Sequence, residues 1–124
     1  MATGKRVLLI GLEPSVVDYS AFPDLDADKV RAGLAAQLAE LRQLGYDAQD
    51  CLTDTGETAE TVVREHLARG PWDCIVIGAG VRTGPPHFLL FERLVNVVHA
   101  HAPQARICFN TRPTDTVEAV RRWI

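Results

Sequence analysis

Two short runs of consecutive apolar residues constrain the fold of this chain more than any other feature. They are Val7–Ile10 and Cys74–Ile77, both rich in branched side chains and followed directly by glycine. An unbroken run of this kind predicts a strand that is buried on both faces, as in the middle of a parallel sheet. A shorter run at Ile107–Phe109 and a weaker extended segment at Ala48–Thr53 predict two further strands, the weaker one on the outside of the sheet.

Helical patterns separate the four predicted strands. The clearest begins after Asp26, a favoured N-cap residue, and ends at Gly45; its apolar positions recur at helical spacing, at Val30, Leu34, Leu38, Leu41 and Leu44. A second helix is expected from Asp54, with Glu57 in capping-box spacing, to Gly70, and a third from Pro86 to about Ala102. The last is expected from Asp115 to the end of the chain.

Strands that alternate with helices predict an α/β three-layer sandwich with helices on both faces of a four-stranded parallel sheet. Right-handed crossovers favour the strand order 2-1-3-4. The whole chain, residues 1–124, is expected to form a single domain of this kind.

The predicted architecture resembles flavodoxin-like, or Rossmann-like, domains, which include response-regulator receivers. The resemblance implies the fold and no site residues. Receivers carry paired acids after the first strand, whereas this strand ends in Gly-Leu-Glu-Pro, and the third ends in Gly-Ala-Gly. Phosphotransferase IIB-type domains need a cysteine straight after the first strand, where Glu13 lies here.

Charge and cysteine content narrow the class of protein. The net charge is −3 with scattered basic residues, so no nucleic-acid partner is expected. The run Val7–Leu12 is too short for a signal segment or a membrane span. The three cysteines form no CxxC pair, which predicts free thiols, a cytoplasmic location and no metal site; the sequence identifies no cofactor.

Ligands of open α/β sheets bind outside the carboxyl ends of the strands, where the strand order reverses. Here that point lies between the first and third strands. The loop Gly78–Gly84 follows the third strand with three glycines, whose free N–H groups precede a helix and suit an anion. The residues expected to bind the ligand are Gly78, Gly80, Arg82, Thr83, Asn110 and Arg112. The alternative is a tight turn that needs left-handed backbone.

Residues near the same edge of the sheet could also form a catalytic site. His87, at the start of the third helix, is the candidate general base, and Glu13 or Asp18 is the candidate acid that orients it. Ser15 would then be a nucleophile, although no G-x-S-x-G elbow is present. The alternative is that His87 caps the helix or faces water.

The sequence therefore predicts a small cytoplasmic domain that binds an anionic small molecule, with hydrolysis or proton transfer by His87 if it is an enzyme. The long irregular segment Glu13–Leu25 is expected to contribute to the site. The alternative is a non-catalytic, receiver-like interaction module. A wide apolar face on the third helix also predicts a homodimer, with this helix or the neighbouring last one at the interface.

Overall fold

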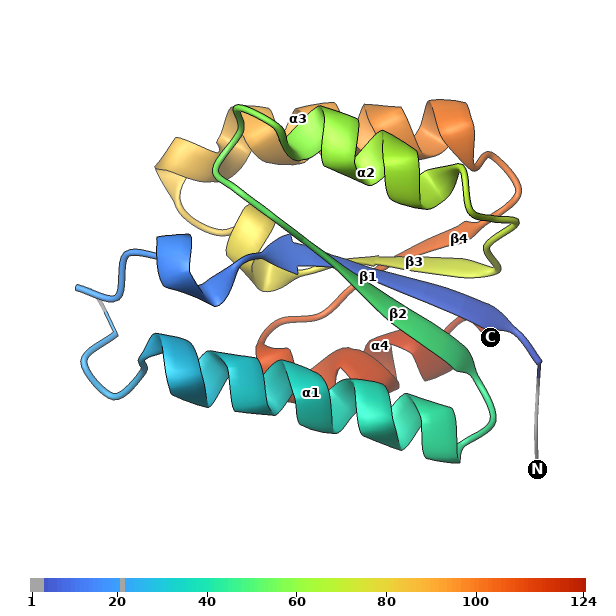
Figure 1. Ribbon diagram of the computed structural model, residues 1–124, viewed down its shortest axis with the longest axis horizontal. Coiled ribbons are helices and arrows are strands. Elements are labelled where there is room, and N and C mark those ends of the chain that lie inside the picture. Colours follow the sequence, from blue (N-terminus) through green and yellow to red (C-terminus); the bar gives the residue numbers. More distant parts are fainter. Residues whose placement is uncertain (1–3, 21) are drawn as a thin grey trace.

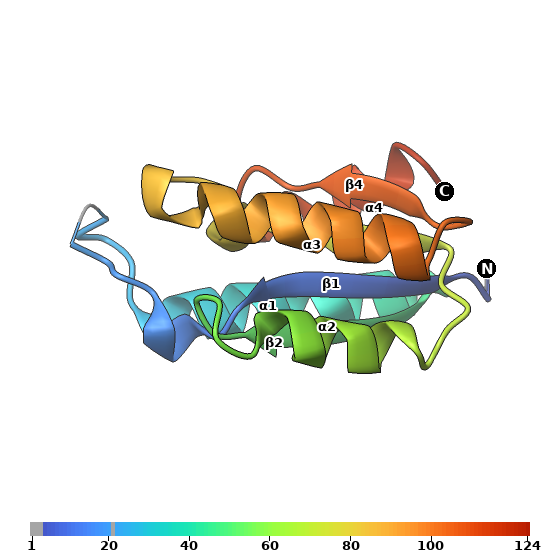
Figure 2. The same cartoon turned by 90° about the horizontal axis from the view of Figure 1, so that it is seen from above.

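The computed structural model describes residues 4–20 and 22–124 and contains a four-stranded, all-parallel sheet with helices on both faces (Figure 1). The sheet order is β2-β1-β3-β4, as predicted, so the α/β flavodoxin-like architecture is confirmed. The strands are β1 (Arg6–Leu12), β2 (Asp47–Thr53), β3 (Cys74–Ile77) and β4 (Arg106–Phe109). Viewed from above, β2 and β4 lie at opposite edges of the sheet (Figure 2).

Two helices cover each face of the sheet. Helices α2 (Ala59–Leu67) and α3 (Phe88–His101) lie on one face, and α1 (Ala27–Gln43) and α4 (Thr116–Arg121) on the other (Figure 1). Short 3₁₀ turns tighten four loops, at Pro14–Val16, Ala79–Val81, Pro85–His87 and Pro113–Asp115. Within the described part of the chain, no helix combines the length and the apolar character needed to cross a membrane.

The two central strands are buried on both sides, which explains their unbroken apolar sequences. Successive side chains of a strand point to opposite faces. The side chains of β1 and β3 therefore supply two separate core clusters, one under α1 and α4 with Val7, Leu9 and Val76, the other under α2 and α3 with Leu8, Ile10, Ile75 and Ile77. The register pairs Leu8 with Ile75 and Ile10 with Ile77, so the apolar runs lie side by side.

The helix starts agree with the sequence in one case and differ in another. Asp26 caps α1 as predicted, with a carboxylate oxygen 2.8 Å from the N–H nitrogen of Lys29. The predicted start of α2 at Asp54 is wrong, because that carboxylate accepts hydrogen bonds from the N–H groups of Gly56 and Thr58 and from the Thr58 hydroxyl. It thereby closes a loop over residues 54–58, and the helix begins only at Ala59.

All three cysteines are free thiols in the core. Burial raises the pKa of Cys51 to about 12, and the hydrogen bond with the Cys108 thiol, together with burial, raises the pKa of Cys74. We expect the thiols of the folded protein to react with Ellman's reagent at about pH 8 at least ~100-fold more slowly than in guanidinium chloride, because thiolate is the reactive form. A thiol in the folded protein that reacts at the denatured rate would contradict this burial.

Candidate functional site

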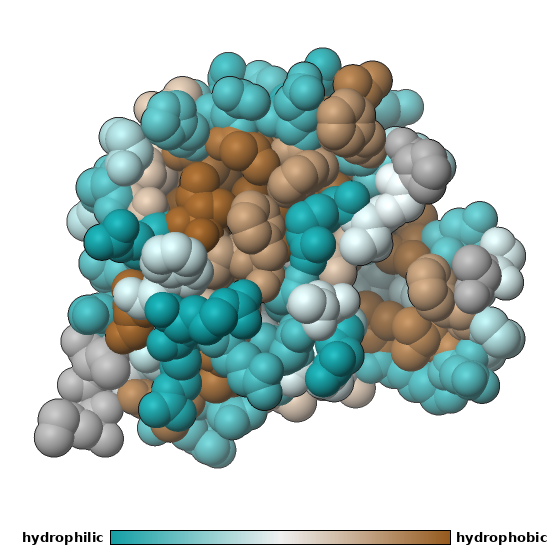
Figure 3. All heavy atoms as spheres, turned by 180° about the vertical axis from the view of Figure 1, so that it is seen from behind, coloured by the Kyte–Doolittle hydropathy of each residue, from teal (hydrophilic) through white to brown (hydrophobic). Residues whose placement is uncertain are grey.

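A pocket of about 220 Å³ opens at the carboxyl ends of β1 and β3, where the strand order reverses. Four stretches form it: the end of β1, residues 17–20 and 22–34, the loop after β3 and the loop after β4. Its lining comprises Leu9, Ile10, Gly11, Leu12, Val17, Tyr19, Phe22, Leu25, Val30, Leu34, Gly78, Ala79, Gly80, Thr83, Asn110, Thr111, Arg112 and Pro113. Figure 3 shows apolar side chains gathered around a hollow at this end of the molecule, on the right of the view.

One wall of the pocket is apolar and comes from the long segment between β1 and α1. Within it, the Tyr19 hydroxyl donates to the carbonyl oxygen of Pro14 at 2.7 Å, and the Phe22 N–H donates to the Tyr19 carbonyl at 2.9 Å. These local bonds fold the segment on itself, and the 2.6 Å ion pair between Glu13 and Arg31 ties its start to α1. Val30 and Leu34 of α1 complete the wall. The side chain of Phe22 is 56% exposed and lies at the mouth of the pocket.

The opposite wall depends on the buried amide of Asn110. Its Oδ1 accepts the N–H of Ala79 at 2.8 Å, and its Nδ2 donates to the hydroxyl of Thr116 at 2.9 Å. Asn110 therefore ties the loop after β3 to the start of α4. The sequence predicted Asn110 as a ligand-binding residue; in the structure it lines the pocket and fixes the relative position of the two loops.

The glycines after β3 have different roles. A Cβ atom on Gly78 would lie 3.0 Å from the backbone oxygen of Ile10, so any larger residue would push β1 and β3 apart by a few tenths of an ångström. Gly84 has a φ of 91°, the left-handed turn that the alternative interpretation required. Gly80 has neither constraint, since its nearest neighbour would be Leu12 Cβ at 3.8 Å. Thr83 also lines the pocket, but its hydroxyl donates to the Ala79 carbonyl.

The two arginines predicted to converge on one ligand lie in different places. Arg112 lines the pocket and is exposed, with Nε 3.1 Å from the hydroxyl oxygen of Thr114. Arg82 does not line it; its Nη2 donates to the backbone oxygen of Asn110, and its guanidinium lies 5.5 Å from the ring centroid of Phe109. Among the residues that the structure describes, Arg112 alone brings a positive charge to the pocket lining.

Asp115 orders the loop that carries Arg112. Although burial opposes ionisation, hydrogen bonds from Thr111 and from the N–H of Arg112 lower the pKa of Asp115 below its ordinary value. The carboxylate therefore stays ionised at neutral pH and holds the backbone of residues 111–115 in one turn. Together with the Nε contact to Thr114, this turn keeps the Arg112 guanidinium at the rim.

Two of the residues predicted for catalysis are joined, since the Ser15 hydroxyl donates to the Glu13 carboxylate at 3.5 Å, but neither is hydrogen-bonded to His87 in the described part of the chain. Glu13 accepts a 2.6 Å hydrogen bond from Arg31, which lowers its pKa, and the Ser20 N–H lowers the pKa of Asp18. His87 is half-buried at the N-cap of α3 and makes no side-chain capping bond. Over residues 4–20 and 22–124, no hydrogen bond or ion pair links His87 to Glu13, Asp18 or Ser15, and none of these four lines the pocket.

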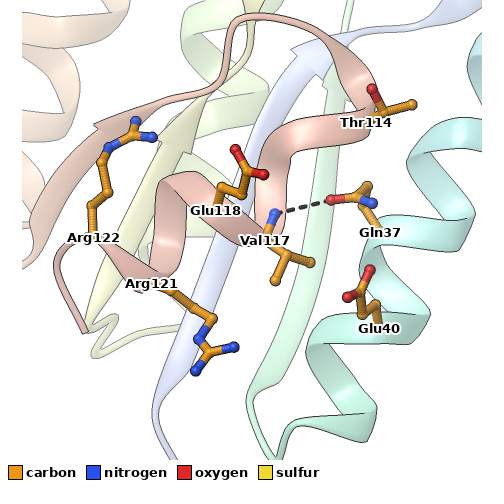
Figure 4. A pocket seen from close by; sticks show the side chains of 7 residues that line it. All are labelled: Gln37, Glu40, Thr114, Val117, Glu118, Arg121 and Arg122. Atoms are coloured by element: carbon orange, nitrogen blue, oxygen red, sulfur yellow. Dashed lines mark hydrogen bonds between the residues drawn. The ribbon is translucent and has the colours of Figure 1, made fainter.

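A second hollow, between α1 and α4, is larger but shallow and charged (Figure 4). The Gln37 side-chain oxygen accepts the N–H of Val117 at 2.9 Å, which joins the two helices beneath it. Around that bond lie side chains of both signs, Glu40, Glu118, Arg121 and Arg122, which converge on no common point in Figure 4. The pocket at the strand ends is therefore the candidate site.

No model of a known protein family and no curated protein matches the sequence. Among the described residues, no group of three or more histidine, cysteine, aspartate or glutamate side chains is placed to hold a metal ion.

The pocket offers a ligand an apolar wall, a hydrogen-bonded backbone floor and one arginine. The sequence located the floor, the arginine and the segment Glu13–Leu25, but it named only Glu13, Ser15 and Asp18 as candidates there and missed the apolar residues that form the wall.

The double contact of Asn110 predicts a large structural effect. Asn110→Ala leaves the N–H of Ala79 without its acceptor and removes the donor to the Thr116 hydroxyl, which keeps only its 3.4 Å bond to the Pro113 carbonyl. An unmet buried group costs roughly 1–3 kcal/mol. We expect the free energy of unfolding to fall by about 2–4 kcal/mol in urea titrations. The matched control is Asn96→Ala on the exposed face of α3, with an expected change below about 0.5 kcal/mol. Equal effects of the two substitutions would show that Asn110 does not hold the loops together.

Proposed function

We propose that this protein binds a small molecule with an apolar body and a single carboxylate or phosphate group at the carboxyl end of the sheet. The observation that carries the proposal is one pocket with an apolar wall and a single arginine, Arg112, at its rim. Small-molecule sites are commonly of this type, mostly apolar with a few polar groups that fix the orientation. The anion predicted from the sequence thereby becomes the charged end of an amphipathic ligand.

The two ends of such a ligand would be held by different forces. Burial of its carbon chain against Val30 and Leu34 contributes roughly 25 cal/mol per Å² of apolar surface. The guanidinium of Arg112 adds a charge-assisted hydrogen bond at the rim, where water weakens it. The loop backbone between these ends is already hydrogen-bonded, so little ordering is needed on binding.

The proposal is one of binding, with turnover by His87 as a further step. Proton transfer by His87 requires a substrate group that extends beyond the pocket lining, because His87 lies outside it.

We also propose a cytoplasmic location. The three free thiols support it, since two of them lie 3.2 Å apart and would be at risk of oxidation outside a reducing compartment.

Octanoate and octanol have the same carbon chain and differ in their charge, so together they test the apolar wall and Arg112 separately. We expect calorimetric titration to detect octanoate binding by the wild type, and Arg112→Ala to weaken it by about 10-fold, the effect of losing one charge-assisted hydrogen bond. Octanol binding should be the same in both proteins. Gly80→Leu should abolish both, since the new side chain would occupy the pocket beside Leu12.

Arg93→Ala is the matched control, because Arg93 is an exposed arginine on α3, outside this pocket. It should leave the octanoate affinity unchanged. Unchanged affinity in Gly80→Leu would place the octanoate elsewhere. An equal loss of octanoate affinity in Arg93→Ala and Arg112→Ala would mean that the affinity depends on the general surface charge and not on Arg112.

The start of α3 favours a second candidate function, self-association. Phe88 and Leu89 stand next to each other and are 59% and 73% exposed. Adjacent apolar side chains on a surface are typical of contact sites, and two-fold dimers are the commonest oligomers.

For the homodimer, light scattering at high micromolar concentration should give twice the monomer mass for the wild type and the monomer mass for Leu89→Glu. The control is Val16→Glu, a similarly exposed position outside α3, which should remain dimeric. A monomer mass for the wild type at that concentration would contradict the dimer.

A further inference from the structure

The outer edge of β4 is the least covered part of the sheet. In Figure 2 no further strand flanks β4 on that side, where the end of the chain, in red, extends past it, and in Figure 3 the edge faces the viewer. In a parallel ladder, alternate residues of an edge strand bond to the neighbouring strand. The N–H of Arg106 donates to Asp73 at the entrance to β3, so the backbone groups of Ile107 and Phe109 point outward. This edge therefore offers backbone donors and acceptors to a further strand.

The side of the edge that faces α3 is apolar. The rings of Phe109 and Phe91 meet edge to face, with centroids 5.9 Å apart, and Ile107 and Val95 are half-buried beside them. Phe109 remains 37% exposed. An apolar patch over β4 and α3 is visible in Figure 3. A strand added at this edge would cover the patch with every second side chain.

The side of the edge that faces α4 is positively charged. Arg106 lies on this side because its neighbour Ile107 packs under α3 and side chains alternate along a strand. Arg122 lies at the end of α4 (Figure 4), and its Nη2 donates to the outward carbonyl of Phe109 at 2.8 Å. Neither arginine forms an ion pair within the described residues, although the chain as a whole carries a net charge of −3.

The nearest acids do not neutralise these arginines. Asp73 accepts a hydrogen bond from the N–H of Arg6 at 2.8 Å and forms no ion pair with Arg106. Glu118 lies one helical turn from Arg122, and its carboxylate forms no ion pair with it.

We propose that the β4 edge binds an extended acidic peptide segment of a partner protein as a fifth strand. Apolar side chains of the peptide would pack on Ile107 and Phe109, and its alternate acidic side chains would pair with Arg106 and Arg122. The backbone of the peptide bonds to the outward groups of Ile107 and Phe109, while Arg122 exchanges the Phe109 carbonyl for a peptide carboxylate. Such strand addition takes affinity from backbone bonds and specificity from alternate side chains.

A second copy of this chain fits the same edge less well. Two copies related by a two-fold axis would bring Arg106 and Arg122 of both edges into one interface, and like charges brought together oppose binding. The bond from Arg122 to Phe109 also covers the edge with a charged side chain, a common protection against pairing between copies.

The test uses a fluorescently labelled short peptide of alternating glutamate and valine with the full chain, read by fluorescence anisotropy. We expect this peptide to bind, and the corresponding lysine–valine peptide to bind at least ~10-fold more weakly. Methylation of the peptide nitrogens that would bond to β4 should also weaken binding at least ~10-fold, because strand pairing needs those donors.

Two protein variants locate the site. The double substitution Arg106→Ala with Arg122→Ala should weaken the acidic peptide at least ~10-fold, whereas the matched control Arg93→Ala should leave its affinity unchanged. Equal binding of the lysine peptide or of the methylated peptide would overturn the proposal, as would an equal loss in the control. Absence of peptide binding would overturn it as well. So would a dimer of this chain that blocks peptide binding and that the substitution Ile107→Lys dissociates.

Discussion

Pairing of β1 with β3 is the contact on which the rest of the molecule depends. Both strands are buried on both faces, and their side chains supply both core clusters, so neither helix layer packs without them. The chain leaves β1 toward α1 on one face and leaves β3 toward α3 on the other. The loops after these two strands consequently diverge, and the candidate pocket is the space between them. The close approach of Gly78 to the Ile10 carbonyl closes its floor.

The polar groups around this space mostly serve the protein itself. Asn110 and Asp115 are buried and satisfy backbone donors of the loops after β3 and β4, and their bonds join these loops to α4. Buried polar networks of this kind make the loop geometry unique. What remains for a ligand is the apolar wall and the exposed guanidinium of Arg112, which is why the site suits an amphipathic molecule better than free phosphate.

The sequence was sufficient for the fold because its signals are local and repeated. The unbroken runs at Val7–Ile10 and Cys74–Ile77 admit few structures other than central parallel strands, and the topology then locates the site. The start of α2 was mispredicted because the Asp54 carboxylate bonds to the loop that precedes the helix. The spacing of Asp54 and Glu57 fits either a helix cap or such a loop, so it does not decide between them.

Arg82 shows the limit of sequence prediction at the site. Its position in the loop after β3 was predictable, but its direction depends on the carbonyl of Asn110 and the ring of Phe109, which β4 brings from the far end of the sequence. The apolar wall was harder still, because Phe22 and Leu25 lie in a segment without periodicity and reach the pocket only through turn bonds.

The most direct measurement of the central claim is residue-by-residue mapping of octanoate binding by amide NMR. Saturable shifts of the amide signals of Gly78, Gly80 and Thr83, with none for α2, are the result that an amphipathic ligand in this pocket predicts. Shifts confined to α2 and α3, or no saturable shift at millimolar octanoate, would contradict it.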